Sequence, residues 1–286
     1  MAVDLPGVGK NLQDHYGTFL TPYLSVAPAS VKERTVWRDW IEYWANSSGA
    51  MSSSGFEGNM LIVSNHTRTE RGEPNWPDLQ IFFSGAQNTF IGTGLAQLFN
   101  LKEDVMMKYF GQFEGQYRLS VVNMIVRPYS RGTVTLQSAD PLTPLLFDPK
   151  YFSDERDMKI LIEGAKRATQ ILENSRPMKK IDTHFAYTAF PGCEAFPLKS
   201  DAYWDCFHRQ LTVTVWHPTS TCAMGKKTDP DAVVDSKLRV YGTRNLRVAD
   251  ASVMPIVPAG NTNAPSIMVG EMAADIIKET WRVRRA

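Results

Sequence analysis

One of the five histidines, His217, has the sequence context of a general base. It follows a β-prone run and stands between Trp216 and Pro218, whose fixed φ favours a rigid polar turn after it. A histidine at the end of a strand is held in one direction, and its ordinary pKa lies near neutral, where proton transfer is most useful. The residues alone leave a second interpretation open, an ordinary buried histidine whose hydrogen bonds are satisfied.

A second polar side chain, Asn263, comes just before the last apolar segment of the chain. Small and polar residues lead from Gly260 to Asn263, and a helix is predicted from about Pro265 to Lys278. Asparagine is a common N-cap, and proline suits the first helical turn. Backbone N–H groups at such a helix start can hold an anion or a partial negative charge on a cofactor. Capping alone explains Asn263, so the helical pattern by itself assigns it no chemistry.

Other common kinds of site find no support in the sequence. The histidines are not spaced as in H-x-x-x-H or H-E-x-x-H, so no metal site is expected; they are His15, His66, His184, His208 and His217. There is no G-x-S-x-G segment of the kind that carries a hydrolase nucleophile. Gly7-Val8-Gly9 begins like a dinucleotide fingerprint, but no third glycine follows and Pro6 precedes it instead of a strand.

Length and composition limit the classes of protein that remain. The chain has 286 residues, of which 43% are hydrophobic and 21% charged, enough for one large globular domain or two ordinary ones. Its formal net charge of +1 implies no recruitment of nucleic acid or of an anionic membrane. No apolar run is long enough for a membrane span, and the start shows no signal peptide, which says little about a chain that begins within a longer protein.

Three cysteines are present, and no two of them have the C-x-x-C spacing of a metal site. Twelve residues separate Cys193 from Cys206, and Pro197 is among them. In an oxidising compartment a disulfide between them would stabilise the fold by about 3 kcal/mol. Two buried thiols are the alternative, and the sequence does not decide between them.

Periodicity predicts a mixture of strands and helices. An aromatic-faced helix is expected near 37–46, strands at 59–63 and 79–83, and an exposed loop at 68–77. A hairpin is predicted between 116–126 and 133–136, with Gly132 supplying a positive φ at the turn. The clearest helix is capped by Ser153 and stopped by Pro177, and further strands are expected at 211–216 and 246–249. Strands followed by long helices indicate an α+β fold, a sheet with helices on one face.

Long ordered segments carry a resemblance to a known family. Three lie near the end of the chain: VWHPTSTCAMG at 215–225, DPDAVVDSKLRVYGTRNLRVADASVMP at 229–255 and AGNTNAPSIMVGEMAADII at 259–277. Two lie upstream, RPYSRGTVTLQSADPLTPLLFDPKYFSDERD at 127–157 and DLPGVGKNLQDH at 4–15. Together they resemble the C-terminal region of the glucose-methanol-choline (GMC) oxidoreductases. PGCEAFPLKSDAYWDC at 191–206 points to the insect glucose dehydrogenase-like branch of that family.

The resemblance implies FAD as the cofactor and assigns roles to individual residues. His217 matches the active-site histidine of the family, and Asn263 matches its partner. The remaining matches are to residues near the cofactor: Asp250 and Ala251 along the FAD pyrophosphate and ribityl chain, Trp216 beside the catalytic histidine, and Ala264, Pro265 and Met268 in the helix that points at the flavin ring.

The same resemblance implies an architecture of three parts. Residues 1–20 would leave the FAD domain, 21–210 would form a substrate-binding domain with an antiparallel or mixed sheet backed by helices, and 211–286 would add the C-terminal strand and helix of the FAD-binding α/β domain. The G-x-G-x-x-G element of the Rossmann part, which holds the ADP half of FAD, does not occur in the sequence. We therefore expect the C-terminal portion of a longer enzyme, whose N-terminal half binds most of the FAD.

The expected activity is oxidation of an alcohol or sugar CH–OH group by proton abstraction and hydride transfer to the flavin, with a quinone or oxygen as the final acceptor. A non-catalytic binding protein, a fragment without FAD and a flavoprotein lyase acting on hydroxynitriles are the alternatives. Similarity to the insect enzymes implies secretion. Trp44, Phe56, Glu57 and the loop 87–99 are candidates for the substrate pocket, with ordinary packing as the alternative.

Overall fold

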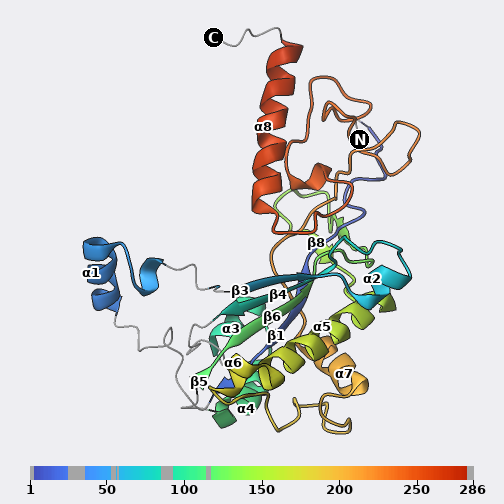
Figure 1. Cartoon of the computed structure of the whole chain (residues 1–286). Coiled ribbons are helices and arrows are strands. Elements are labelled where there is room, and N and C mark those ends of the chain that lie inside the picture. The colour runs from blue at the N-terminus through green and yellow to red at the C-terminus, as the bar shows by residue number, and fades with distance from the viewer. Residues whose placement is uncertain are drawn as a thin grey trace. The chain divides into compact units, whose positions relative to one another are not determined.

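A computed structural model describes residues 3–24, 36–52, 56, 58–84, 93–113 and 117–281 (Figure 1). The chain divides into two compact units. One, called the sheet unit below, comprises residues 17–125 and 158–213. The other, called the loop unit, comprises residues 1–16, 126–157 and 214–286, so it is assembled from three stretches that are far apart in the sequence.

A five-stranded sheet organises the sheet unit, with strand order β10-β1-β6-β4-β3. The strands are β1 (Tyr16–Leu20), β3 (Gly58–Ile62), β4 (Leu79–Ser84), β6 (Ser120–Ile125) and β10 (Val213–Thr214). Antiparallel pairing joins β3 to β4 and β4 to β6, with Leu79 opposite Ile125 and Ser84 opposite Ser120. All six residues of β6 are buried, which matches its place in the interior of the sheet.

One long helix, α5 (Glu155–Asn174), runs along a face of this sheet (Figure 1). Its apolar side chains recur at helical spacing, and the buried ones are Met158, Ile160, Leu161, Ala165, Ala168 and Leu172. Gly164 lets the helix approach closely, because a Cβ there would collide with the side chains of Asn123 and Leu79. The amide of Asn123 in β6 donates to the carbonyl of Leu161 at 2.9 Å, which fixes the helix on the sheet.

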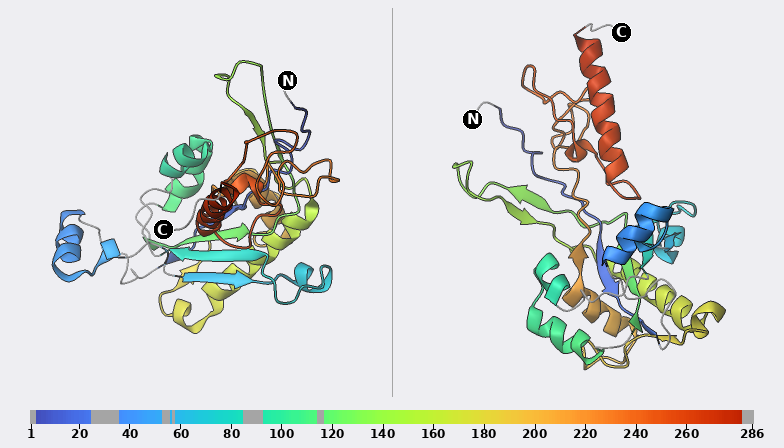
Figure 2. Two further views of the ribbon diagram at one scale, coloured as in Figure 1. Left: turned by 90° about the horizontal axis from the view of Figure 1, so that it is seen from above. Right: turned by 90° about the vertical axis from the view of Figure 1, so that its left-hand side faces the viewer.

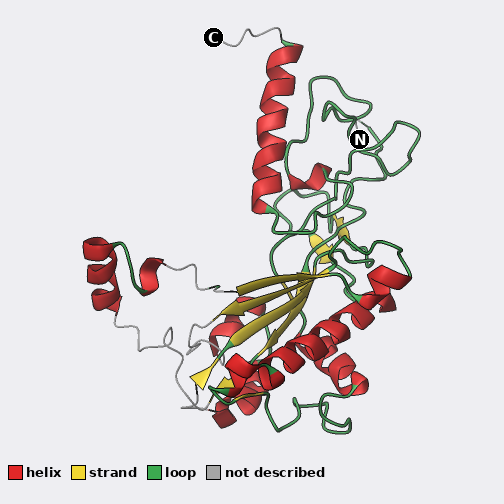
Figure 3. Cartoon of the chain, viewed as in Figure 1, coloured by secondary structure: helices red, strands yellow, loops and turns green. Residues whose placement is uncertain are grey.

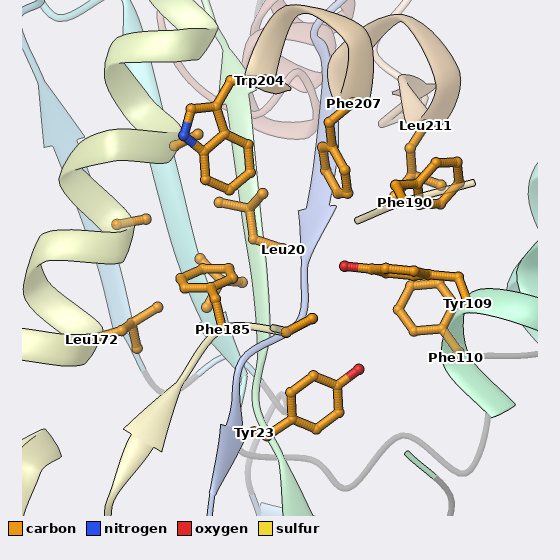
Figure 4. Close-up of a cluster of buried hydrophobic side chains, with 14 of the residues drawn as sticks. Leu20, Tyr23, Tyr109, Phe110, Leu172, Phe185, Phe190, Trp204, Phe207 and Leu211 are labelled. Atoms are coloured by element: carbon orange, nitrogen blue, oxygen red, sulfur yellow. The ribbon is translucent and has the colours of Figure 1, made fainter. Parts of the chain in front are cut away.

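The core of the sheet unit is rich in aromatic rings (Figure 4). Helix α7 (Asp201–Leu211) and helix α4 (Glu103–Phe110) supply several of them, and Phe185 and Phe190 come from the irregular segment between α5 and α7. Cys193 is fully buried beside this core and forms a disulfide with Cys206, with a Cα–Cα distance of 5.8 Å. The structure thus selects the disulfide over two separate thiols.

Shorter elements complete the sheet unit. They are β2 (Tyr23–Leu24), α1 (Val36–Asn46), η2 (Ala50–Ser52), α2 (Asn65–Thr69), α3 (Thr93–Phe99), η3 (Gly111–Phe113), β5 (Tyr117–Arg118), α6 (Arg176–Lys179) and β9 (Thr183–His184). Strands β5, β2 and β9 form a small second sheet. Within the described residues, no helix has the length and apolar character that crossing a bilayer requires.

The loop unit consists mostly of irregular chain (Figure 3). Its regular elements are the antiparallel pair β7 (Thr133–Thr135) and β8 (Leu146–Asp148), the single turn η4 (Ala251–Val253) and the straight helix α8 (Asn263–Thr280), which Figure 2 shows end-on and from the side. A small core joins η4 and α8 to the irregular segment 233–240; it is formed by Val233, Val234, Leu238, Val240, Val253, Val269 and Ala273.

The α+β prediction is confirmed, and so are the strands near 59–63 and 79–83 and the helices near 37–46 and 155–174. The predicted hairpin between 116–126 and 133–136 is wrong. Strand β6 pairs with β4, whereas β7 pairs with β8. Gly132 does not have a positive φ; it is required because a Cβ there would overlap the backbone of Asp148 and Pro149.

Three other local predictions need correction. The strand expected at 211–216 is limited to Val213–Thr214, because Leu211 is the last residue of α7. The strand expected at 246–249 is reduced to one bridge between Arg239 and Arg247. Helix α8 begins at Asn263 itself, and the residue in the N-cap position is Thr262, which makes no side-chain capping bond.

Two boundaries also differ from the sequence pattern. Pro177 does not stop the long helix, which ends at Asn174; it lies instead in the first turn of α6, where proline is well tolerated. The segment 68–77, predicted as a loop, begins with the last residues of α2.

Candidate active site

The segment from Gly9 to His15 forms the framework of the candidate site within the loop unit. Leu12 exchanges two backbone hydrogen bonds with Gly132, at 2.8 and 3.0 Å, and Gln13 exchanges two with Thr219, at 2.8 and 3.2 Å. The carbonyl of His15 then accepts a bond from the N–H of Val215 at 3.1 Å. These ladder-like contacts fix residues 12–15 against the segment that carries His217.

Gln13 connects this framework to the loop before α8. Its side chain is buried, its amide Nε2 donates to the carbonyl of Pro255 at 3.0 Å, and its Oε1 accepts from the N–H of Val257 at 3.2 Å. A buried amide that uses both ends in this way fixes the path of the loop. The loop in turn leads to Asn261 and to the start of α8.

Asp14 organises the chain around the candidate histidine. Its Oδ1 accepts the backbone N–H of His217 at 3.0 Å, and its Oδ2 accepts the hydroxyls of Tyr151 and Thr214, each at 2.6 Å. Burial, together with the adjacent carboxylate of Asp14, raises the pKa of Tyr151 well above its ordinary value, so this phenol remains a donor. Trp216 has a positive φ of 58°, and its N–H donates to the Thr214 hydroxyl at 2.9 Å.

The imidazole of His217 lies against a second imidazole. Its Nδ1 is 3.0 Å from Nδ1 of His15, and the two rings meet edge to face at an interplanar angle of 84°. The other nitrogen of His15, Nε2, lies 2.9 Å from the carbonyl oxygen of Pro258. His15 is completely buried, whereas His217 is only partly covered.

Both histidines are neutral at physiological pH. Burial, assisted by the neighbouring His217, lowers the pKa of His15 to about 4, although the carbonyls of Pro258 and Val126 oppose the shift. Burial also lowers the pKa of His217, against the opposing effect of the Asp14 carboxylate. A neutral, half-buried imidazole with a fixed orientation is suited to accept a proton.

The amide of Asn261, not that of the predicted partner Asn263, makes the contact with His217. Asn261 Nδ2 lies 3.4 Å from His217 Nε2. Asn263 lies two residues further on, exposed, as the first residue of α8. The exposed carboxamides of Asn261 and Asn263 therefore lie on either side of the buried Thr262, at the N-terminus of α8. The side chain of Thr262, the N-cap residue, makes no capping hydrogen bond to the first N–H groups of the helix.

The other residues predicted to contact a cofactor lie in the loop unit as well. Asp250 caps η4, where its Oδ1 accepts the N–H of Ser252 at 2.8 Å, and Ala251 is the first residue of that turn. Trp216 is 55% exposed and Met268 is 60% exposed. Ala264 and Pro265 lie in the first turn of α8.

Three residues of the site, Asp14, His15 and Asn261, are not identified by the sequence patterns. His15 precedes His217 by 202 positions, and no periodicity or motif spacing relates residues so far apart. The signal that could have found two of them is the polar run NLQDH at 11–15, in which a buried glutamine, carboxylate and histidine occur consecutively.

The predicted pocket residues fall in the sheet unit. Phe56 is 55% exposed, and its ring centroid lies 5.5 Å from that of Phe82 in β4. Trp44 projects from α1 and is 78% exposed. Glu57 and the first part of the loop, 87–92, lie outside the described residues, and 93–99 form α3.

Comparison with known proteins decides the family. A family model described as GMC oxidoreductase matches residues 128–270, half of the chain, including His217 and the start of α8. The chain belongs to the GMC oxidoreductase family.

Individual GMC relatives match nearly all of the chain. The glucose dehydrogenase [FAD, quinone] of Drosophila pseudoobscura pseudoobscura is 37% identical over 97% of the chain and 41% of its own length. The oxygen-dependent choline dehydrogenase of Pseudomonas fluorescens (strain SBW25) is 32% identical over 96% of the chain and 43% of its own length. The chain thus spans less than half the length of these two relatives.

A solved structure supports the fold in the same way. The R554A variant of formate oxidase from Aspergillus oryzae RIB40, described in a study of FAD modification, superposes with a TM-score of 0.77 at 27% identity. The match covers 98% of this chain and 48% of the formate oxidase chain.

Proposed function

We propose that this chain is the catalytic, C-terminal portion of an FAD-dependent enzyme that oxidises the CH–OH group of an alcohol or sugar. The observation that supports it best is the arrangement around His217: a neutral imidazole, partly exposed, with its Nε2 side toward the carboxamide of Asn261 and its backbone held by Asp14. Membership of the GMC family and the names of the relatives, glucose and choline dehydrogenases among them, support the same reaction class.

The residues of the loop unit fit the flavin end of FAD. Uncapped N–H groups at the start of α8 suit the electron-rich edge of a reduced flavin, and the exposed side chains of Trp216, Ile267 and Met268 suit a flat apolar ring. The carboxamides of Asn261 and Asn263 can donate or accept hydrogen bonds at the polar edge. Asp250, Ala251, Ala264 and Pro265 belong to the same proposed cofactor site.

The ADP end of FAD has no comparable support in this sequence. No G-x-G-x-x-G segment occurs in it, and the chain spans 41% of the glucose dehydrogenase relative. We infer that residues 1–20 and 211–286 complete an FAD domain and that 21–210 bind the substrate. The remaining FAD contacts would come from an N-terminal half that precedes these 286 residues in the full-length enzyme.

The proposed reaction assigns one task to each polar group. The imidazole of His217 accepts the hydroxyl proton of the alcohol, a step that a positioned base accelerates by about 10²–10⁴-fold. As negative charge develops on the alcohol oxygen, the carboxamide of Asn263 donates a hydrogen bond to it. FAD, when bound, supplies the hydride acceptor, and a quinone or oxygen removes the electrons afterwards.

The disulfide Cys193–Cys206 indicates an oxidising compartment. Disulfides persist in oxidising compartments, and Cys193–Cys206 closes a surface segment beside the core of the sheet unit. Together with the similarity to the insect glucose dehydrogenases, this favours secretion.

The experiment uses the full-length protein that contains this chain. Purified protein is expected to carry FAD absorbance and to be bleached by an alcohol or sugar under anaerobic conditions. His217→Ala should reduce the rate of bleaching by about 10²-fold or more, while the FAD content stays unchanged. Near-normal bleaching by that variant would refute the role of His217.

Two further results would replace the proposed function. A well-folded protein without flavin would favour a non-catalytic binding role. Cleavage of a hydroxynitrile without bleaching would favour a lyase.

A further inference from the structure

We propose that His15 is a positioning residue that selects the tautomer of His217, so that Nε2 of His217 carries the basic lone pair and Nδ1 carries the hydrogen. The inference rests on the proposed function, in which His217 is the base, and adds which of its nitrogens acts and what determines that choice. His15 itself is buried behind His217 and is not assigned any contact with the substrate.

The contact of His15 with the Pro258 carbonyl determines where His15 carries its hydrogen. Its Nε2 lies 2.9 Å from the carbonyl oxygen of Pro258, and a carbonyl oxygen can only accept a hydrogen bond. A neutral imidazole carries one hydrogen, and His15 is fully buried beside another imidazole, which disfavours the charged form. The hydrogen therefore resides on Nε2, because otherwise two lone pairs would face each other at hydrogen-bond distance, and the Pro258 carbonyl acts on His15 more strongly than the carbonyl of Val126 does. It follows that Nδ1 of His15 has no hydrogen.

The unprotonated Nδ1 of His15 in turn determines the tautomer of His217. Its Nδ1 lies 3.0 Å from the unprotonated Nδ1 of His15, so His217 must be the donor in that hydrogen bond. The single hydrogen of neutral His217 is thus held on Nδ1, and its Nε2 is left as an acceptor. The contact with Asn261 agrees, since the amide nitrogen Nδ2, a donor, lies 3.4 Å from His217 Nε2.

Backbone and side-chain hydrogen bonds around His15 maintain its contact with Pro258. The carbonyl of His15 accepts the N–H of Val215, and the adjacent Gln13 binds the loop at both Pro255 and Val257. The loop that presents the Pro258 carbonyl and the segment that presents His15 are therefore joined by independent hydrogen bonds. Neither imidazole needs to reorganise when His217 changes its protonation state.

The consequence for catalysis resembles the role of the third residue in a catalytic triad. In a triad, a group that does not touch the substrate holds the catalytic histidine in the correct tautomer. A substitution that favours the other tautomer lowers turnover by about 10⁴-fold. Here a neutral imidazole serves as the acceptor instead of a carboxylate. It directs the hydrogen without adding a charge that would raise the pKa of His217.

The test reads the tautomer directly, by two-bond ¹H–¹⁵N correlation spectra of the full-length protein with ¹⁵N-labelled histidine. In the wild type, His217 is expected as the Nδ1–H form, with the signal assigned by its loss in His217→Gln. His15→Phe removes the acceptor, and the Nε2–H form should then predominate. Turnover should fall by about 10-fold or more, with little change in KM and full FAD occupancy.

Two variants separate this role from a general effect on folding. His15→Asn offers a side-chain oxygen near the position of Nδ1, so it should restore the Nδ1–H form of His217 and much of the turnover. His208→Phe is the matched control, because His208 is also fully buried and also uses Nδ1, in a 3.0 Å contact with Thr18. It should leave the His217 signals unchanged.

The wild-type spectrum also decides the matter if His15→Phe does not fold. An Nε2–H form of His217 in the wild type, or an unchanged Nδ1–H form in a folded His15→Phe variant, would overturn the inference. Neither result depends on turnover. Failure of the wild type to bind FAD or oxidise an alcohol would instead refute the proposed function, whichever tautomer the spectrum shows.

Discussion

The carboxylate of Asp14 accepts the backbone N–H of His217 at 3.0 Å, which ties the proposed base of the site to a residue 203 positions earlier in the chain. The same carboxylate accepts the hydroxyls of Tyr151 and Thr214. All three stretches of the loop unit thus converge on one buried side chain. The direction of His217 therefore depends on long-range contacts and not only on the proline that follows it.

Asp14→Ala should destabilise the protein and weaken catalysis together. Its loss leaves three partly buried donors, of Tyr151, Thr214 and His217, without their acceptor, which costs roughly 3 kcal/mol in the free energy of unfolding. Chemical denaturation measures the stability, and rapid-reaction bleaching measures the catalytic step. Asp231→Ala is the matched control, because Asp231 pairs with Lys10 at an exposed site. Equal effects of the two substitutions would contradict the organising role of Asp14.

The two carboxamides beside Thr262 should have different kinetic effects. Asn263→Ala should lower the rate of flavin reduction by about 10²-fold, because it removes the proposed donor to the developing alkoxide. Asn261→Ala should change KM more than this rate, because Asn261 occupies the side of His217 that the substrate hydroxyl must approach. Single-turnover kinetics over a range of substrate concentrations separates the two effects. The reverse pattern would assign the alkoxide donor to Asn261.

The pH dependence of flavin reduction should follow the lowered pKa of His217. The neutral imidazole is the active form, and burial holds its pKa below the ordinary value. The rate should therefore stay high as pH falls through the range in which a free histidine becomes protonated, and decline only at lower pH. Asp14→Asn removes a negative charge that raises this pKa, so the decline should move to still lower pH. A movement to higher pH would contradict the assignment.

Removing the disulfide should destabilise the sheet unit without affecting the flavin chemistry. A loop of this size contributes about 3 kcal/mol when it is closed, so Cys193→Ala with Cys206→Ala should lower the denaturation midpoint by a corresponding amount. Cys222→Ala is the control, since Cys222 is a free thiol in the loop unit. Thiol titration of the denatured wild type should find Cys222 reactive and the other two protected.

Local patterns predict those elements whose burial repeats along the sequence. Buried residues recur at helical spacing in α5, half-buried and exposed residues alternate in β3, and β4 is a short, mostly buried run; all three predictions are confirmed. The hairpin prediction failed because two β-prone runs joined by a short Gly-containing segment resemble hairpin partners, whereas their true partners lie elsewhere. Strand β6 is satisfied by β4 and β7 by β8, and no local signal specifies these choices.

In the candidate site, too, some residues can be found from local sequence and others only from their distant partners. His217 and the start of α8 can be found from the sequence because they lie in segments with a strong family resemblance and a recognisable local structure. The polar groups that hold His217, Asp14 and His15, cannot, because burial of a carboxylate and an imidazole in one short run becomes meaningful only once their distant partners are known. Asn261 contacts His217 and lies two residues before Asn263, the first residue of α8, and no local pattern distinguishes these two carboxamides.

The segment that ends at His15 has no spare length. Gly9 has a positive φ and lies so close to Val134 that a Cβ on Gly9 would collide with the Val134 carbonyl. Leu12 forms two backbone hydrogen bonds with Gly132, and Gln13 forms two with Thr219. One residue inserted or deleted between Gly9 and His15 would displace the imidazole by about 3.3 Å along the strand and turn the opposite side chains inward. Natural variation in this stretch should consequently take the form of exchanges at exposed positions such as Lys10, with its length held constant.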